Sequence, residues 1–244
     1  MSSRAPDKAP PLLLVDNLSA GYGGMPVLRN LSIEVGEGEI VALVGSNGAG
    51  KTTTLRALSR VIPCQGAILF GGRDLLPMTP DQAFQAGLVQ VPEGRELFDR
   101  MTVEDNLLMG AYLRPDKAET ARDLQRMYTL FPRLGERRRQ LAGSMSGGEQ
   151  QMCAMARALM ARPRLLTIDE MSLGLAPVIV EQLTQVLSEI LDEGVTVLLV
   201  EQDVHTALSV ADRGYVMETG SLVRSGPAAM LIEDPAVREA YLGL

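Results

Sequence analysis

The chain has few cysteines, a single histidine, no long apolar run and no excess of basic residues. Its two cysteines, Cys64 and Cys153, show neither the spacing of a metal site nor a disulfide framework, which favours a reducing compartment. The longest apolar stretches, such as TVLLV, have the length of strands, whereas a membrane-spanning helix needs about 20 residues. The N-terminal sequence MSSRAPDKAPP lacks the apolar segment of a signal peptide, and we expect a disordered tail at residues 1–11.

The shortage of basic residues argues against a nucleic-acid partner. Lys and Arg number 23 against 30 Asp and Glu, whereas a general nucleic-acid binder normally presents a basic face. The one basic run, RLGERRR at residues 133–139, is typical of a solvated helix end. With 244 residues, of which 46% are hydrophobic, the chain can bury the core of one α/β domain with an insertion.

Short β-branched runs alternate with helical segments, which is typical of a sheet covered by helices. The run at residues 39–44 is nearly all apolar, as in central parallel strands buried on both faces. Residues 31–35 instead alternate apolar and polar side chains, which predicts an antiparallel layer before the parallel core. We expect strands at residues 12–16, 31–35, 39–44, 66–70, 87–91, 164–169, 195–200, 214–219 and 221–225.

Between residues 91 and 162 the sequence becomes helical, which predicts an inserted helical lobe. Thr102 and Asp105 have the spacing of a capping box, and Asp116 can cap the next helix. Asp234 before a proline predicts a last short helix. We therefore divide the domain at residues 12–244 into a core, residues 12–92 and 163–244, and a helical lobe, residues 93–162.

The sequence GSNGAGKTT follows the apolar run EIVALV and precedes a helical segment, which is the context of a phosphate-binding loop. Its glycines allow successive backbone N–H groups to turn toward a polyphosphate, and the helix that follows directs its positive end at the same anion. Lys51 would bind the β- and γ-phosphates, and the Thr52 hydroxyl would bind Mg²⁺. The predicted nucleotide-binding residues of this phosphate loop are Gly45, Ser46, Asn47, Gly48, Ala49, Gly50, Lys51, Thr52 and Thr53.

Two further motifs carry chemistry. The strand RLLTIDE ends in Asp169 and Glu170, and neighbouring strand residues face opposite sides unless the backbone turns. Asp169 would hold Mg²⁺ through water, and Glu170 would polarise the water that attacks the γ-phosphate. The segment SMSGGEQQM opens a long helix, where Gly147, Gly148 and Glu149 follow the capping Ser146 and form a second predicted anion site.

With these three motifs in this order, the chain from Leu12 to its end resembles the ATP-binding subunit of an ABC transporter. The resemblance implies an α/β fold with a RecA-like P-loop ATPase core, an antiparallel β layer and an inserted helical lobe. It implies ATP hydrolysis with ATP and Mg²⁺ as cofactors. It also implies a head-to-tail dimer, in which Ser146, Gly147 and Gly148 contact the γ-phosphate held by the partner's phosphate loop.

Other roles follow from the same resemblance. Tyr22 falls where an aromatic ring stacks on adenine, and residues 172–177, SLGLAP, would contact the other subunit. Glu93 stands where the family usually has glutamine, and its carboxylate could hold Mg²⁺ or orient water. Gln202 stands where most members have a switch histidine, and it could donate a hydrogen bond to the γ-phosphate without becoming cationic.

Two residues near these positions carry expectations of their own. Met171 replaces the usual proline after Glu170, so we expect a less rigid corner there. The lone histidine, His205, is expected to be a surface or packing residue.

The segments VPEGR, MSGGEQQM, SLGLAP, VEQ and AYLG together resemble the second of the two ATPases of branched-chain amino acid importers, and urea and short-amide importers share much of this pattern. The resemblance implies a cytoplasmic subunit, peripheral on the inner membrane. Its partners would be a second ABC ATPase subunit, identical or different, and inner-membrane permease subunits, which residues 93–109 of this chain would contact. A periplasmic binding protein would be an indirect partner. The alternatives are a soluble ABC ATPase of translation or DNA repair and a regulatory cassette with little turnover.

Overall fold

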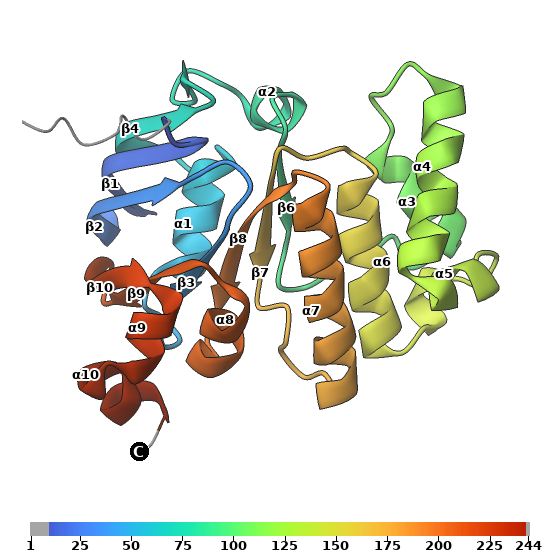
Figure 1. Cartoon of the computed structure of the whole chain (residues 1–244). Coiled ribbons are helices and arrows are strands. Elements are labelled where there is room, and N and C mark those ends of the chain that lie inside the picture. The colour runs from blue at the N-terminus through green and yellow to red at the C-terminus, as the bar shows by residue number, and fades with distance from the viewer. Residues whose placement is uncertain (1–9, 243–244) are drawn as a thin grey trace, which may run out of the picture.

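The computed structural model describes residues 10–242, and its strands form two sheets (Figure 1). The first sheet is antiparallel, as the alternating pattern predicts, with the strand order β2-β1-β4-β5. It comprises β1 (Leu13–Tyr22), β2 (Met25–Val35), β4 (Cys64–Phe70) and β5 (Arg73–Asp74). Residues 1–9 of the predicted N-terminal tail lie outside the described residues.

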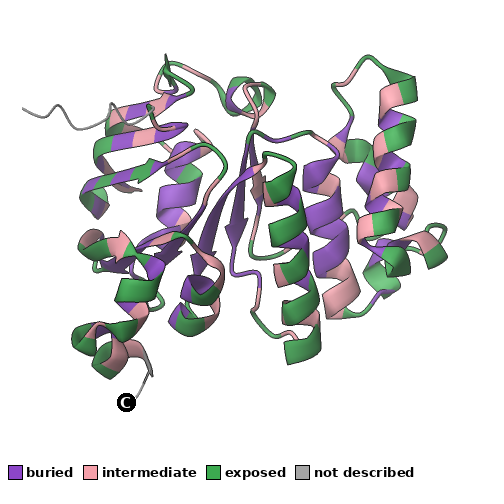
Figure 2. Ribbon diagram, viewed as in Figure 1, coloured by how far each residue is buried: buried purple, intermediate pink, exposed green. Residues whose placement is uncertain are grey.

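The second sheet has the order β10-β9-β3-β8-β7-β6 and is parallel except for the pairing of β9 with β10. Its strands are β3 (Ile40–Val44), β6 (Leu88–Val91), β7 (Leu165–Asp169), β8 (Thr196–Glu201), β9 (Arg213–Glu218) and β10 (Ser221–Pro227). Every residue of β3, β7 and β8 is buried, as expected for central parallel strands (Figure 2). All the predicted strands are present, and only the two-residue β5 was not predicted.

The six-stranded sheet separates two apolar cores. Successive strand residues face opposite sides, so Val197 and Leu199 of β8 join one core while Leu198 and Val200 join the other. The second core lies between this sheet, the antiparallel sheet and α1 (Lys51–Leu58). The first core packs the sheet against helices that include α6 (Gly147–Leu159), α7 (Pro177–Asp192) and α8 (Val204–Val210).

The helices between β6 and β7 extend the first core outward (Figure 1). They are α3 (Val103–Gly110), α4 (Lys117–Leu130) and α5 (Pro132–Glu136), and a short 3₁₀ turn (Ala142–Ser144) leads from them into α6. Buried residues of α4 belong to the same apolar cluster as the parallel sheet, so this region is continuous with the core beneath it. The boundaries of the helical lobe at residues 93 and 162 stay a prediction.

The remaining helices lie at the chain's other turns: α2 (Pro80–Gln85), α9 (Ala228–Glu233), α10 (Pro235–Val237) and a terminal π turn (Arg238–Leu242). The predicted caps are confirmed. Thr102 and Asp105 form a capping box, Asp116 accepts hydrogen bonds from the first turn of α4, and Asp234 does so at α10. Among the described residues, no helix combines the length and apolarity needed to cross a membrane.

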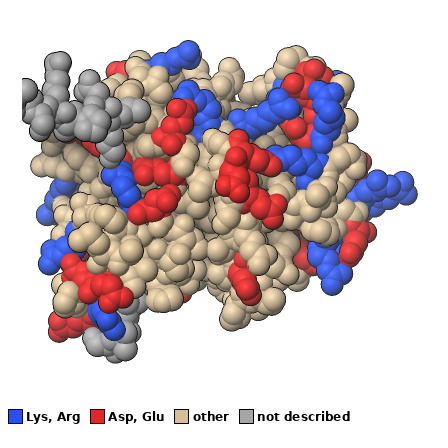
Figure 3. All heavy atoms as spheres, viewed as in Figure 1, with Lys and Arg blue, Asp and Glu red and all other residues tan. Residues whose placement is uncertain are grey.

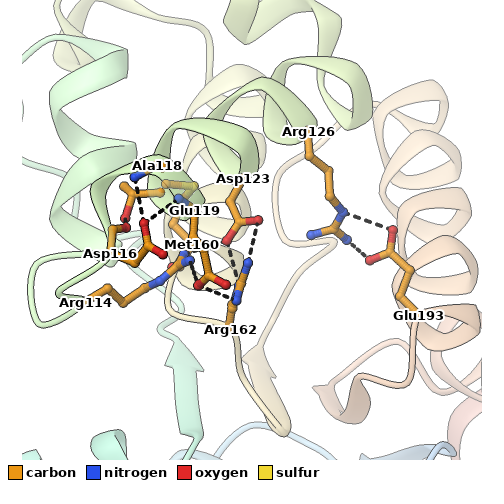
Figure 4. Close-up of polar contacts among 10 residues, drawn as sticks. Arg114, Asp116, Ala118, Glu119, Asp123, Arg126, Met160, Arg162 and Glu193 are labelled. Carbon is orange, nitrogen blue, oxygen red and sulfur yellow. Dashed lines mark hydrogen bonds and ion pairs between the residues drawn. The ribbon is translucent and has the colours of Figure 1, made fainter.

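A network of ion pairs joins α4 to the chain that follows α6 (Figure 4). Asp123 accepts from Arg114 Nη1 at 2.6 Å and from Arg162 Nε at 2.7 Å, and Arg114 also donates to the Met160 carbonyl. Arg126 of α4 pairs with Glu193 at the end of α7. The orientation of α4 is therefore fixed by charged contacts as well as by its apolar face.

Candidate nucleotide-binding site

The phosphate loop runs from the carboxyl end of β3 to α1, as predicted. Gly45 lies so close to β9 that a Cβ atom there would be 2.3 Å from the Met217 carbonyl oxygen. Gly50 has a φ of 109°, and a Cβ atom there would be 2.8 Å from Met217 Cε. A side chain at either position would displace the loop, so glycine is required by the loop's close packing on β9.

The N-terminus of α1 is suited to an anion. Its N-cap, Gly50, makes no side-chain hydrogen bond, and the first turn contains no acidic residue. The first N–H groups and the positive end of the helix dipole are therefore not offset by a carboxylate. The N-terminus of α6 differs, because Ser146 caps it and Glu149 lies in its first turn.

Lys51 is buried at the base of the loop, with 5% of its surface exposed. Its Nζ donates to the Gly45 carbonyl at 2.9 Å and to the Ser46 carbonyl at 3.3 Å. The same Nζ forms an ion pair with Glu170 Oε1 at 3.1 Å. A buried ammonium surrounded by oxygen atoms, at the start of an uncapped helix, is arranged to meet phosphate oxygens.

Asp169, at the end of β7, has the properties of a metal ligand. It is 1% exposed, and its Oδ1 has no hydrogen-bond partner among the described residues. Burial raises the pKa of Asp169 to about 6, a hydrogen bond from Thr52 acts in the other direction, and the nearby carboxylate charges add to the increase. An orphaned carboxylate oxygen beside a threonine hydroxyl fits the oxygen ligands that Mg²⁺ prefers.

Glu170 turns away from the strand by an unusual backbone conformation. Its φ is +51°, which is rare for a residue with a Cβ atom. The turn removes the strict alternation of the strand, so both acids at the end of β7 can serve one site. Glu170 Oε2 accepts a hydrogen bond from the Gln202 N–H at 3.1 Å, while Oε1 faces Lys51.

A cleft brings the predicted residues together at the carboxyl end of the parallel strands. Glu93 and Gln202 are exposed at its wall, and Glu93 is close enough for its charge to raise the pKa of Asp169. Val27 was not predicted, because its apolar side chain belongs to no motif, and it lines the same cleft. Leu173, from the segment at residues 172–177 expected to contact the other subunit, lines the cleft as well. The residues lining the cleft are Val27, Asn47, Gly48, Gly50, Lys51, Thr52, Thr53, Glu93, Glu170, Leu173 and Gln202.

Tyr22 and the second anion motif do not line this cleft. Tyr22 is 41% exposed at the end of β1, and its hydroxyl accepts a hydrogen bond from Arg56 Nη1 at 3.2 Å. Ser146 is exposed, and its N–H and hydroxyl both donate to Glu149 Oε2. The Glu149 carboxylate therefore takes part in the capping box of α6, and its predicted contact with nucleotide stays a prediction.

His205 lies on the exposed side of α8, as expected of a surface histidine. Met171 is buried in the first core, with 1% of its surface exposed. The corner after Glu170 is therefore held by apolar packing in place of a proline ring.

The fold and the cleft define a P-loop ATPase of the ABC type. The family model described as ABC transporter matches residues 28–172, and the chain belongs to this family. It is the ATP-binding subunit of an ABC transporter and hydrolyses ATP.

Individual proteins similar to this chain are consistent with membership of this family. The chain is 46% identical over 233 residues to the high-affinity branched-chain amino acid transport ATP-binding protein BraG of Pseudomonas aeruginosa, covering 95% of this chain and 100% of BraG. It is 31% identical to the lipopolysaccharide export system ATP-binding protein LptB of Escherichia coli, covering 95% and 97%. A solved ATP-binding subunit of an ABC transporter superposes with a TM-score of 0.83 at 30% identity, covering 95% and 96%.

Proposed function

We propose that this subunit drives an importer of branched-chain amino acids from the cytoplasmic face of the inner membrane. The observation that carries the proposal is the 46% identity to BraG over the whole of that protein, against 31% to the lipopolysaccharide export subunit. The segments that resemble branched-chain importers include VPEGR and VEQ, which contribute Glu93 and Gln202 to the cleft.

In the proposed site, the phosphate loop and α1 bind the triphosphate, and Lys51 exchanges its contact with Glu170 for phosphate oxygens. Thr52 and Asp169, together with Glu93, would hold Mg²⁺, which adds positive charge beside the β- and γ-phosphates. Tyr22 would stack on the adenine ring.

Hydrolysis is proposed to depend on Glu170 and Gln202. Once Lys51 has turned to phosphate, Glu170 Oε1 is free to accept a proton from the attacking water. The Gln202 amide would donate a hydrogen bond to the γ-phosphate, while its backbone N–H keeps Glu170 Oε2 in place.

A second ATPase subunit is proposed to complete the site. Ser146 and its two glycines lie outside this chain's own cleft, and Ser146 is exposed. Leu173 lines the cleft and is 53% exposed, so an apolar side chain of the segment at residues 172–177 faces outward beside the phosphate loop. Closure of the dimer around ATP would bring the partner's Ser146 to the γ-phosphate, and hydrolysis would release it.

The permease is proposed to contact a hollow lined by Phe84, Gln90, Glu96, Phe98, Met109, Gly110, Ala154, Arg157 and Ala158. Phe98 is 46% exposed and Met109 38%, so apolar side chains remain uncovered at its edge. Arg157 of α6 donates to the Arg95 and Glu96 carbonyls, and Arg95 donates to Gln150. Movement of the loop at Glu93 would therefore reach both α6 and this hollow.

Solute uptake tests the proposal. In cells of the source organism from which the gene for this subunit has been deleted, the wild-type chain should restore uptake of labelled leucine, isoleucine and valine. The Glu170→Gln variant should not. Permease subunits should co-purify with a tagged chain from membranes. Restored uptake of urea without amino acid uptake would place the chain with the urea and short-amide importers instead, and ATP hydrolysis with no permease bound would contradict a role in transport.

A further inference from the structure

Glu201 is a fully buried acid beside the proposed catalytic residues, and no role has been given to it above, although it is the middle residue of the segment VEQ. It is the last residue of β8, and its exposed fraction is 0%. A charged group in that position is costly unless hydrogen bonds satisfy it. Both of its oxygens are satisfied by one residue, because Oε1 accepts from the Ser172 N–H at 2.9 Å and Oε2 accepts from the Ser172 hydroxyl at 3.0 Å.

These two bonds belong to a larger set that joins the end of β8 to the turn after β7. The Glu170 N–H donates to the Val200 carbonyl at 2.8 Å, and the Gln202 N–H donates to Glu170 Oε2 at 3.1 Å. The last two residues of β8 and the residue that follows it thus contact Glu170 or Ser172. Among these three residues of β8 and its end, only Glu201 makes its contacts through its own side chain.

The turn needs such support. Glu170 has a φ of +51°, a conformation that persists only where its surroundings hold it. Proline would restrict the next backbone position, but Met171 stands there and contributes only packing. The carboxylate of Glu201 reaches the residue after Met171 and ties it to the neighbouring strand.

We propose that Glu201 is a positioning residue, which holds Glu170 and the segment at residues 172–177 in the geometry needed for hydrolysis. The inference rests on the proposed role of Glu170. Glu201 does not line the cleft, so it would act on the water only through Glu170 and on the second subunit only through Ser172 and Leu173.

Its burial supports this role. Burial raises the pKa of Glu201, the hydrogen bonds from Ser172 lower it, and the charge of Glu170 and a hydrogen bond with Glu170 raise it further. Burial opposes the ionisation of Glu201, so solvation does not favour a carboxyl group at this position, whereas its two hydrogen bonds to Ser172 give it a structural role.

The test compares Glu201→Met with Glu201→Gln in the full chain, purified with the subunits that co-purify. Methionine fills the space without accepting the two bonds, whereas the glutamine carbonyl can accept from the Ser172 N–H and its amide can donate to the Ser172 hydroxyl. We expect Glu201→Met to lower kcat for ATP hydrolysis about 10- to 100-fold, the scale of a slightly misplaced catalytic group, with KM unchanged within about twofold. Glu201→Gln should keep kcat within about threefold of the wild type.

Thr196→Val is the matched control, because Thr196 is a fully buried acceptor at the opposite end of β8 and receives the Gly38 N–H at 2.9 Å. It should lower the melting temperature and leave kcat unchanged. If Glu201→Met does not fold, Glu201→Gln combined with Ser172→Ala removes the contact between the two side chains and should lower kcat where Glu201→Gln alone does not.

Two results separate this inference from the proposed function. In the first, Glu170→Gln abolishes hydrolysis, but a folded Glu201→Met has the wild-type kcat or a kcat no lower than that of Glu201→Gln. Glu201 is then not a positioning residue. If Glu170→Gln hydrolyses ATP normally, the proposed role of Glu170 is wrong, and the inference about Glu201 is wrong with it.

Discussion

At the scale of single residues, the end of β7 shows how the charges of the site hold one another in place. Lys51 and Glu170 are both buried and form an ion pair, and neither could remain charged there alone at low cost. In the proposed site, a bound triphosphate would take the place of Glu170 beside Lys51. The ammonium would then stay paired, while Glu170 would lose its cation and become available as a base.

Gln202 and His205 provide a test of which residue senses the γ-phosphate. Gln202 lines the cleft, whereas His205 is exposed on α8 and does not. Gln202→Ala should lower kcat for ATP hydrolysis about tenfold, because one hydrogen bond to the transferring group is lost. His205→Ala should leave kcat unchanged. The reverse result in steady-state assays would show that the histidine holds the role assigned to the glutamine.

The sequence predicted the residues of the site that lie in motifs and missed those that depend on long-range contacts. The phosphate loop, Asp169, Glu170, Glu93 and Gln202 all meet at the cleft or beside it. Glu201 could be noticed as a charge that ends an apolar strand, but its partner, Ser172, becomes apparent only when β7 and β8 are paired. Apolar lining residues such as Val27 carry no chemical pattern.

At the scale of elements, the two helix N-termini at the anion motifs are prepared differently. Helix α1 begins without a side-chain cap, whereas Ser146 and Glu149 form a complete capping box on α6. Arg137 Nε holds Glu149 Oε1 at 2.8 Å, so this carboxylate is restrained from two sides. A phosphate can therefore approach α1 directly, but at α6 it must compete with Glu149 for the hydroxyl of Ser146.

The ion pairs around Asp123 should stabilise the packing of α4 (Figure 4). Burial opposes ionisation of Asp123, but hydrogen bonds from Arg162 and Arg114 outweigh it and lower its pKa. Asp123→Asn should cost about 2 kcal/mol of unfolding free energy, typical of hydrogen bonds to a charged group. For a chain of this size, the melting temperature of the variant should then be about 4–8 °C lower than that of the wild type.

The pH dependence checks the cause of this effect. Because the pKa of Asp123 is lowered in the folded state, the stabilisation is complete above the unfolded-state value of 3.8 and is lost as the pH falls through the folded-state value. The difference between wild type and Asp123→Asn should therefore persist at pH 7 and shrink below pH 3.8. Glu136→Gln, in an exposed ion pair with Arg133, is the control and should change stability little. An equal loss in both variants would contradict a special role for the network.

The elements themselves were largely predictable. Apolar runs and alternation identified the strands, and capping residues identified the starts of α3, α4, α6 and α10. The sequence did not show that α4 shares one apolar core with the parallel sheet, since that depends on how the helices pack. The two residues of β5 were missed because so short a strand has no periodicity.

At the scale of the whole molecule, the proposed site is shared between this chain and a second subunit. On the face shown in Figure 3, basic side chains lie among acidic ones without forming one continuous positive surface. The net charge of -7 likewise shows no excess of the basic residues that a nucleic-acid binder normally presents. Residues of the phosphate loop line this chain's cleft and Ser146 does not, which supports the proposal that a second subunit contributes to hydrolysis.

The most direct measurement is ATP hydrolysis by mixtures of two purified variants. Ser146→Arg should bind ATP as the wild type does, because Ser146 is outside its own cleft, but it should not hydrolyse it. Lys51→Ala should not hydrolyse ATP either, because its own phosphate loop lacks the ammonium group that would bind the phosphates. In an equal mixture, each dimer of one variant with the other has one intact site, so about a quarter of the wild-type activity should return. Hydrolysis by Ser146→Arg alone at the wild-type rate, or a mixture no more active than its components, would contradict a site formed by two copies of this chain.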